Sequence, residues 1–554
     1  RVDKIVGEGA EAIWVSTFHS SCVRILRRFI DRLGYDTNFT IYDGDDQKTL
    51  MKQVLKKMQA DPKQFKERAV LSRISAAKND RITADEFEQQ AGADFREKKI
   101  AQIYREYQKE LKKNNALDFD DLLVKTVELF EANADVLEYY QDKFRYIMVD
   151  EYQDTNLVQF KLVDLLAKKY RNICVVGDDD QSIYRFRGAK PEIMLHFKDD
   201  YPEAETVLLD VNYRSVKNIV TSAGYLIGHN KERFQKKIEA ADQGDIPVEW
   251  QLFESQRKEN ARIIWDIQEA VEKGAKYEEF AVLFRTNTQP RLLMEQLMEY
   301  NIPFRTRDTV PNLYEHWIAK DIFAYIRIAL GSRERRDSLQ IMNRPKRYIS
   351  RESLDEETVA FDVWEWYYEE QPWVAKRIEK LEGDIRMLER LSPYAAINYI
   401  RKAIGYDEFC TEYADYRRIK ADDLFDVLDE LLDAAREYKT YDAWFDHIEN
   451  YTKELQEFYR VQNQNPNSVA LATLHSAKGL EYENVYIIDV NEGVMPYKKA
   501  VLEPEVEEER RMFYVGMTRA KKNLHLFSVR QLNHKDAEIS RFIKEAQPPE
   551  KKKD

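Results

Sequence analysis

The sequence predicts an α/β protein with two mainly parallel sheets, each interrupted by a long helical insertion. Short apolar runs separated by segments with helical periodicity predict the strands of such sheets. The runs fall into two blocks, and a stretch of helical pattern interrupts each block. The first block holds the runs 146–149, 173–176 and 207–209, and the second holds 248–253, 280–284, 469–473, 485–490 and 524–527.

The first block begins with a strand, a cap and a helix. Residues 13–16 are expected to form a strand and Thr17 a helix cap. Apolar residues then recur at helical spacing from Cys22 to Leu33, and Gly34 ends the helix. Residues 36–117 are charged and helical in pattern, without a strong strand signal.

The second block is interrupted by residues 305–461, a helical stretch rich in Trp and Tyr. Residues 507–520 predict a helix with Phe513 and Met517 in the core and Arg519 near its end. The tail 548–554 combines prolines with charged residues and is expected to be disordered.

Composition excludes several classes of protein. Hydrophobic residues make up 43% of the 554 positions and aromatic residues 12%, which excludes a largely disordered chain. The sequence contains no run of eighteen apolar residues, which is the length that would predict a membrane span. The three cysteines and eight histidines form no metal-ligand spacing, which fits a reducing cytoplasm. The net charge of −13 argues against a general polyanion binder, although a basic groove can coexist with an acidic outer surface.

Two adjacent carboxylates are the first candidate site. Asp150 and Glu151 follow the run 146–149, which predicts a buried strand, and ligands of open α/β sheets bind at the carboxyl ends of strands. Neighbouring side chains on an extended chain point in opposite directions, so one acid can hold Mg²⁺ while the other orients or deprotonates a water. Paired acids alone more often mark a solvated surface. The phosphate-binding pattern G-x-x-x-x-G-K-[ST] does not occur in the sequence.

Other strand-end loops hold possible companions of this pair. Gln181 can sense a γ-phosphate, and Phe186 with its flanking arginines can stack on a base and hold its phosphates. Tyr213 can stack on adenine while Arg214 reaches a phosphate. Arg519 can act as an arginine finger. For each residue alone, a structural loop, a core tyrosine or a surface arginine is an open alternative.

Taken together and in order, these segments resemble the UvrD/PcrA/Rep group of superfamily 1A DNA helicases. The resemblance spans nearly the whole chain. The segments that resemble the family's motifs are Asp-Glu-Tyr-Gln-Asp-Thr from 150, Gln-Ser-Ile-Tyr-Arg-x-Arg-Gly-Ala from 181, Asn-Tyr-Arg-Ser from 212, His-Ser-Ala-Lys-Gly-Leu-Glu from 475 and Tyr-Val-Gly-x-Thr-Arg-Ala from 514.

The resemblance implies two RecA-like domains of the P-loop NTPase type, each with an inserted helical domain. The first RecA-like domain would comprise 1–35 and 118–208, with insertion 36–117. The second would comprise 209–304 and 462–547, with insertion 305–461.

The resemblance also implies roles for individual residues. Asp150 would hold Mg²⁺ and Glu151 would be the catalytic base, with Gln181 as the γ-phosphate sensor. Tyr213 would stack on adenine, Arg214 and Arg519 would bind the γ-phosphate, and Glu481 beside Gly479 would lie near the ribose. The positions that resemble DNA-contacting or coupling residues are Thr17, Phe18, His19, Tyr184, Phe186, Arg187, Arg285, Asn287, His475 and Lys478.

The implied function is 3′→5′ movement along single-stranded DNA, driven by ATP with Mg²⁺ at a cleft between the two RecA-like domains. Single strands and single-strand/duplex junctions would be the substrates, in DNA repair, recombination or replication. Protein partners that stimulate unwinding, a monomeric or weakly dimeric state and a place in the bacterial cytoplasm at the nucleoid are also expected.

Four departures from the family pattern qualify this expectation. The family's phosphate loop is expected at a point before Arg1, so this motif is missing from residues 1–554. Phe186 stands where close relatives have Trp, Tyr348 and Ser350 stand where the duplex-contacting loop has glycine, and Asn533 stands where a strand-separating tyrosine is expected. Unwinding is therefore expected to be weaker than translocation or to need a protein partner.

Two alternatives stay open at this stage. The chain can be a non-catalytic module that binds single strands or a partner protein. It can also be the helicase half of a nuclease complex of the AddA or RecB kind, although no nuclease-like metal cluster follows Arg519.

Overall fold

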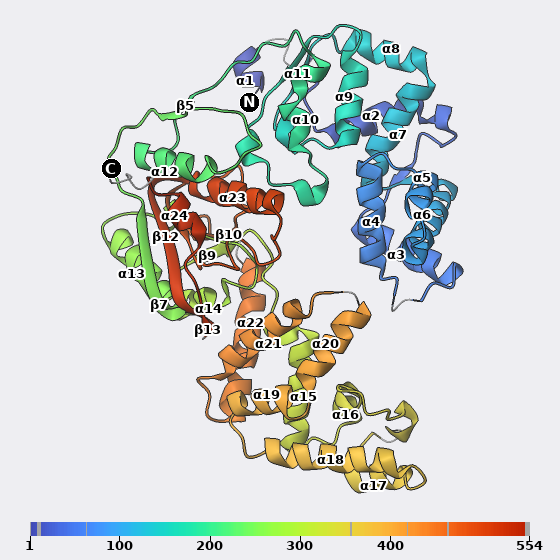
Figure 1. The fold of residues 1–554 in the computed structure, drawn as a ribbon, viewed down its shortest axis with the longest axis vertical. Coiled ribbons are helices and arrows are strands. Elements are labelled where there is room, and N and C mark those ends of the chain that lie inside the picture. Colours follow the sequence, from blue (N-terminus) through green and yellow to red (C-terminus); the bar gives the residue numbers. More distant parts are fainter. Residues whose placement is uncertain are drawn as a thin grey trace. The chain divides into compact units, whose positions relative to one another are not determined.

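The computed structural model describes residues 2–7, 13–61, 64–354, 357–417, 419–461, 465–533 and 535–548. The chain divides into two compact units (Figure 1). Unit 1 comprises Arg1–Leu208 and Asn230–Lys236, and unit 2 comprises Leu209–His229 and Lys237–Asp554. Helices and parallel strand pairs occur in both units, which confirms the predicted α/β fold class.

The first part of unit 1 packs helices beside a short parallel sheet. Strand β3 (Ile147–Val149) pairs with β4 (Ile173–Val175). Helix α2 (Phe18–Phe29) begins at Thr17, whose hydroxyl accepts a hydrogen bond from the Ser20 N–H, and a 3-10 turn after it ends at Gly34 with φ 73°. The predicted cap, helix and stop are thus confirmed. The other helices of this part are α1 (Val2–Val6), α7 (Phe119–Ala132), α8 (Ala134–Lys143), α9 (Leu157–Ala167), α10 (Pro191–Leu195) and α11 (Phe197–Asp200).

The helical part of unit 1 has a hydrophobic core of its own. Met51, Ile100 and Tyr107 are fully buried in it. A two-residue parallel pair, β1 (Thr40–Ile41) with β2 (Ala116–Leu117), brings its two ends together. Its helices are α3 (Gly44–Lys57), α4 (Glu67–Asn79), α5 (Ala84–Gln90) and α6 (Phe95–Lys113).

Unit 2 is built on a larger sheet in the order β13-β12-β11-β8-β10-β9, with β7 also paired to β12. The pairs are parallel except β12 with β13. Strands β8 and β10 are buried along their whole length, which explains their continuous apolar sequence. The strands are β7 (Glu249–Ser255), β8 (Phe280–Phe284), β9 (Phe304–Thr306), β10 (Val469–Thr473), β11 (Tyr482–Ile487), β12 (Ala520–Leu532) and β13 (Lys535–Asp536); β5 (Val211–Asn212) and β6 (Glu239–Ala240) form a separate pair.

Helices flank this sheet, and a long helical part connects two of its strands. The chain leaves the sheet after β9 and returns in β10, the strand that pairs with β9. The flanking helices are α12 (Lys217–Ile227), α13 (Gln256–Glu272), α14 (Arg291–Glu299), α23 (Glu503–Met517) and α24 (Arg541–Glu545). The connecting helices are α15 (Trp317–Ala329), α16 (Arg335–Ile341), α17 (Phe361–Tyr367), α18 (Pro372–Leu388), α19 (Pro393–Lys402), α20 (Tyr406–Arg417), α21 (Ala421–Ala435) and α22 (Tyr441–Val461).

Three strand predictions in the first block were wrong in whole or in part. Residues 13–16 and 207–209 are not strands, and a short strand lies instead at β5. An apolar run becomes a strand only where its backbone groups find a ladder partner. Strand β3 exists, but it is not a buried strand, because Met148 is 81% exposed on one face.

Other predictions fall outside what the structure tests. The boundaries of the four predicted parts stay a prediction. Residues 549–554 of the predicted disordered tail lie outside the described residues. Among the helices of the described residues, none combines the length and apolar character needed to cross a membrane.

Candidate nucleotide and nucleic-acid sites

The two carboxylates lie in the loop that follows β3. Asp150 Oδ1 accepts a hydrogen bond from the Glu151 N–H at 2.9 Å, and Glu151 has a left-handed backbone with φ 53°. This conformation turns the chain sharply at the strand end, so both side chains are exposed. Two exposed carboxylates at a strand end offer the oxygen ligands that Mg²⁺ prefers.

Gln153 connects the carboxylate loop with the loop after β4. Its side-chain amide donates to Glu151 Oε2 at 2.6 Å, and its Oε1 accepts from the Asp178 N–H at 3.0 Å. A Cβ on Gly177 would lie 2.5 Å from that Oε1, so the close approach requires glycine. Gln181 donates to Asp178 Oδ2 at 2.7 Å and thus belongs to the same network. Gln153 was not singled out by the sequence, although it stands within the 150–155 motif.

Asp178, Asp179 and Asp180 bring three carboxylates within 4.8 Å of one another. Lys236 bonds to Asp178 and lies 2.5 Å from Asp179 and 3.1 Å from Asp180. Arg233 adds a two-pronged contact to Asp180 at 2.6 and 2.8 Å. Burial works to raise the pKa of Asp178, but the Lys236 ammonium and hydrogen bonds from Gln181 and the Asp180 N–H together lower that pKa below its usual value. Each of the three carboxylates therefore already pairs with a protein cation, which favours a structural role for this cluster.

The predicted strand-gripping loop of unit 1 displays aromatic rings with an arginine. The Tyr184 and Phe186 rings lie 6.0 Å apart, and the Arg187 guanidinium lies 4.9 Å from the first ring and 5.4 Å from the second. Phe186 is 65% exposed. An exposed ring beside a cation suits base stacking with a neighbouring phosphate contact.

Thr17, Phe18 and His19 form the beginning of α2 in the same unit. Thr17 is the helix cap, and Phe18 is half-buried against two hydrophobic clusters. His19 packs edge-on against Phe119 with ring centroids 6.2 Å apart. Burial lowers the pKa of His19, and nearby Asp120 only partly opposes this shift. A neutral imidazole is therefore favoured near pH 7.

In unit 2, Asn212 orients the candidate nucleotide-binding pair. Its side-chain oxygen accepts from the N–H groups of Arg214 and Ser215 at 2.9 and 3.0 Å, which fixes the turn. Tyr213 is consequently 83% exposed, with its ring available for stacking. Arg214 donates to Glu481 at 2.8 Å. Hydrogen bonds from Arg214 and from Lys521 lower the pKa of Glu481.

Arg519 lies just after α23 and is only 1% exposed. Its guanidinium donates to the carbonyl oxygens of Val515 and Leu480 and to the Thr518 hydroxyl, at 2.9, 3.2 and 3.0 Å. The bond to Leu480 fixes the loop between Gly479, which has φ 82°, and Glu481. The structure thus places Arg214, Glu481, Gly479 and Arg519 in one neighbourhood of unit 2.

The predicted DNA-contacting residues of unit 2 follow β8 and β10. Arg285 makes a two-pronged contact with Glu509 at 2.7 and 3.0 Å and lies 5.1 Å from the Tyr497 ring. Among the described residues, the buried side-chain oxygen of Asn287 has no hydrogen-bond partner. His475 and Lys478 are half-buried in the loop after β10.

Two positions that depart from the family pattern show glycine-like backbones. Tyr348 has φ 61° and Asn533 has φ 49°. The Tyr348 ring packs 5.9 Å from Trp373, with Lys346 and Arg377 at 4.4 and 5.1 Å. Tyr348 therefore keeps the left-handed backbone that glycine adopts most easily and adds an aromatic side chain to it.

The protein thus consists of two α/β units that contain parallel strand pairs, and its strand-end loops carry side chains suited to a nucleotide and to nucleic acid. The family model described as the UvrD/REP helicase N-terminal domain matches residues 1–202, and the UvrD-like helicase C-terminal domain matches 207–531. The chain belongs to the UvrD-like helicase family.

Curated relatives agree with this assignment. The chain is 38% identical over 545 residues to the ATP-dependent DNA helicase PcrA of Staphylococcus epidermidis, covering 95% of this chain and 74% of the relative. It is 37% identical over 549 residues to the PcrA of Staphylococcus aureus, with the same coverage. The predicted family is thereby confirmed.

Proposed function

We propose that this chain is an ATP-dependent DNA helicase or translocase that moves 3′→5′ along single-stranded DNA, in DNA repair, recombination or replication. Family membership supports the general activity, since a curated relative of which this chain covers 74% is named an ATP-dependent DNA helicase. The observation that supports it most directly is the exposed Asp150–Glu151 pair in a loop braced by Gln153. Single strands and single-strand/duplex junctions are the proposed substrates.

In unit 1, the proposed roles follow from the side-chain oxygens. Mg²⁺, when bound, would neutralise phosphate charge, and the Asp150 carboxylate offers it an oxygen ligand. Glu151 would accept a proton from the attacking water. The Gln153 amide donates to Glu151 Oε2 at 2.6 Å and so fixes the orientation of the carboxylate. Gln181 would contact the γ-phosphate.

In unit 2, Tyr213 would stack on adenine, and Arg214 would contact the γ-phosphate while Glu481 holds its guanidinium at 2.8 Å. Glu481 and Gly479 would lie near the ribose. The Arg519 guanidinium is buried and makes three hydrogen bonds within its own unit. Arg214 is therefore the stronger candidate for a direct phosphate contact, and Arg519 would also hold the 479–481 loop in place.

The proposed grip on the single strand uses rings and cations. Phe186 and Tyr184 would stack on bases, each stacked base contributing roughly 1–3 kcal/mol. Arg187 would contact the neighbouring phosphate. The remaining candidates for strand contact are Thr17, Phe18, His19, Arg285, Asn287, His475 and Lys478.

The central test is ATP hydrolysis by the full-length protein with and without oligothymidylate. Oligothymidylate is expected to stimulate hydrolysis by the wild type, and Glu151→Gln is expected to lower the rate by about 10²–10⁴-fold, because the general base is lost. DNA affinity of this variant should stay close to that of the wild type. The exposed substitution Asp415→Asn in α20 is the matched control.

Two outcomes would contradict the proposal. Unchanged ATP hydrolysis in Glu151→Gln would remove the assigned base. Tight DNA binding without any ATP hydrolysis would favour the alternative of a non-catalytic binding module.

Direction is tested separately. Duplexes with a single-stranded 3′ tail should be unwound faster than duplexes with a 5′ tail. On single strands, the protein should reach a label at the 5′ end faster than a label at the 3′ end. A preference for 5′ tails would overturn the proposed polarity.

A further inference from the structure

The end of α4 meets three different segments of unit 1 through three consecutive residues. Lys78 contacts the start of α7, Asn79 contacts Asn156 just before α9, and Asp80 contacts Lys190 after the aromatic loop. The nucleotide loop is defined here as residues 150–156 and the strand loop as 184–188. The end of α4 therefore lies against both loops.

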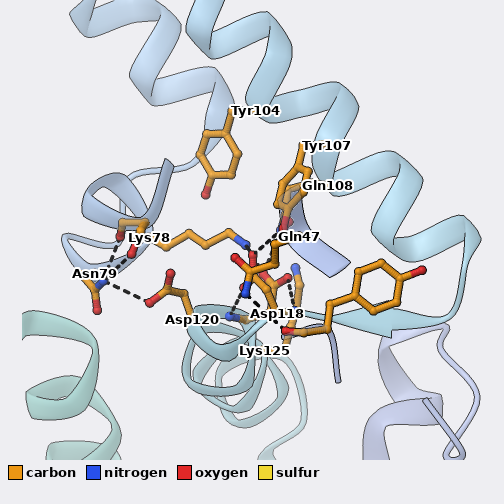
Figure 2. Close-up of polar contacts among 12 residues, drawn as sticks. Gln47, Lys78, Asn79, Tyr104, Tyr107, Gln108, Asp118, Asp120 and Lys125 are labelled. Carbon is orange, nitrogen blue, oxygen red and sulfur yellow. Dashed lines mark hydrogen bonds and ion pairs between the residues drawn. The ribbon is translucent and has the colours of Figure 1, made fainter. Parts of the chain in front are cut away.

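Lys78 anchors this helix end. It is 1% exposed, and its ammonium lies 2.6 Å from Asp118 and 2.9 Å from Asp121. Figure 2 shows Lys78 directed at Asp118. Tyr107 also donates to Asp118, at 3.3 Å. Burial works against the charge on Lys78, but the two aspartates raise its pKa well above the usual value. A buried, hydrogen-bonded ion cluster has little freedom to move, so the position of Asn79 is fixed.

Asn79 uses both ends of its amide. Its Nδ2 donates to the Ser75 carbonyl at 2.8 Å and to Asp120 at 3.1 Å. Figure 2 shows the contact between Asn79 and Asp120. Its Oδ1 accepts from the Asn156 side chain at 2.6 Å. Asn156 in turn caps α9, because its Oδ1 accepts from the Gln159 N–H at 2.9 Å.

Asn79 also packs against the strand loop. A Cβ on Gly188 would lie 3.3 Å from the Asn79 Cβ, and Gly188 has φ 87°. The chain just after the strand loop also contacts the nucleotide loop directly, because the Lys190 N–H donates to the Thr155 carbonyl at 3.0 Å. Asn79 adds a contact between the two loops themselves, through Asn156 in the nucleotide loop and Gly188 in the strand loop.

We propose that Asn79 is a positioning residue that couples DNA binding at the strand loop to the geometry of the nucleotide loop. A base stacked on Phe186 would order the strand loop, and the contact of Asn79 with Gly188 and Asn156 would pass that order to residues 150–156. The inference rests on the proposed function, since it assumes that single-stranded DNA binds at Phe186.

Hydrogen exchange of the full-length protein tests the coupling without any nucleotide. Oligothymidylate is expected to slow amide exchange in the wild type at the strand loop and at residues 151–156. In Asn79→Ala, protection at the strand loop should persist and protection at 151–156 should be lost. Asn156→Ser provides a second variant, because serine still caps α9 but cannot reach Asn79.

Asp80→Asn is the matched control, since it removes the exposed ion pair with Lys190 from the same helix end. It should retain protection at both loops. If Asn79→Ala and Asn156→Ser both keep protection at 151–156, the positioning role is overturned while the proposed function stands. A wild type that shows no protection at the strand loop on DNA addition would overturn the proposed DNA grip, and this inference with it.

Discussion

Glu151 owes its orientation to one backbone angle. With φ 53° it occupies the left-handed region of backbone conformation, which residues other than Gly, Asn and Asp rarely adopt. Such residues persist where the surroundings hold them in place. Here the Tyr152 N–H donates to the Val176 carbonyl at 2.9 Å and Gln153 holds the Glu151 carboxylate, so the loop fixes the proposed base before any ligand binds.

A second left-handed acid, Asp489 with φ 51°, lies fully inside unit 2 beside Glu259. Its N–H donates to Glu259 Oε1 at 3.1 Å, and Gln289 and Gln256 donate to its Oδ2 at 2.9 and 3.2 Å. Among the described residues, no cation pairs with either of these two carboxyl groups. Burial raises the pKa of Asp489 to about 6, and burial with the Asp489 charge raises that of Glu259 further.

This pair predicts a pH dependence of stability. The folded state keeps the Asp489 proton up to about pH 6, whereas the unfolded chain releases it near 3.8. The free energy of unfolding should therefore fall as pH rises from about 4 through 6. Asp489→Asn removes this ionisation and should raise the free energy of unfolding at pH 8 by about 1–3 kcal/mol, with less gain at pH 4.

Urea unfolding at pH 4, 6 and 8 measures this effect. Asp415→Asn, at an exposed helix position, is expected to leave the pH dependence unchanged. An Asp489→Asn variant that gains the same stability at every pH would contradict the explanation.

At the scale of elements, helix caps and buried ions together set where the helical part of unit 1 meets the rest of the unit. Asp118 and Asp121 form a capping box at the start of α7, each side chain accepting the backbone N–H of the other. The same two carboxylates hold Lys78 at the end of α4. One cluster thus caps α7 and fastens α4 to it.

Removing the cation should be more harmful than removing the whole cluster. Lys78→Met leaves two buried carboxylates without their partner and should lower the free energy of unfolding of unit 1 by about 3–5 kcal/mol. The triple variant Lys78→Met, Asp118→Asn, Asp121→Asn should recover part of this loss, since no uncompensated charge then stays buried. Denaturant unfolding with hydrogen exchange at α4 and α7 measures both.

Lys57→Met is the control, because Lys57 is exposed and pairs with Glu106 and Glu110 on the surface. Little change is expected there. Equal destabilisation by Lys57→Met and Lys78→Met would show that burial does not set the strength of the Lys78 cluster.

At the scale of the whole molecule, the sequence predicted what local patterns determine. Strands β8 and β10 match their predicted bounds, since a central parallel strand is apolar along its whole length. Long-range contacts had no such signal: Lys78 and Asp118 lie forty positions apart, and nothing local to either predicts their pairing. The burial of Arg519 and the exposure of Met148 likewise depend on which other segments pack nearby.

The net charge of −13 is a property of the whole molecule. DNA binding can depend on this overall charge or on local contacts with phosphates, and the two cases predict different salt dependence. If binding depends on local phosphate contacts, the logarithm of the binding constant falls linearly with the logarithm of salt concentration, by about 0.7 per phosphate contact on single strands. Arg187→Gln should reduce the magnitude of this slope by about 0.7. Arg386→Gln, at an exposed position in α18 paired with Glu382, changes the net charge equally and should leave the slope unchanged.

Phe186→Ala completes the comparison, because it removes a stacking ring without changing any charge. It should weaken oligothymidylate binding by roughly 1–3 kcal/mol at every salt concentration and keep the wild-type slope. Fluorescence anisotropy over a series of salt concentrations measures all three variants. If Arg187→Gln and Arg386→Gln change the slope equally, overall charge governs the interaction, and the strand loop then has no special place in DNA binding.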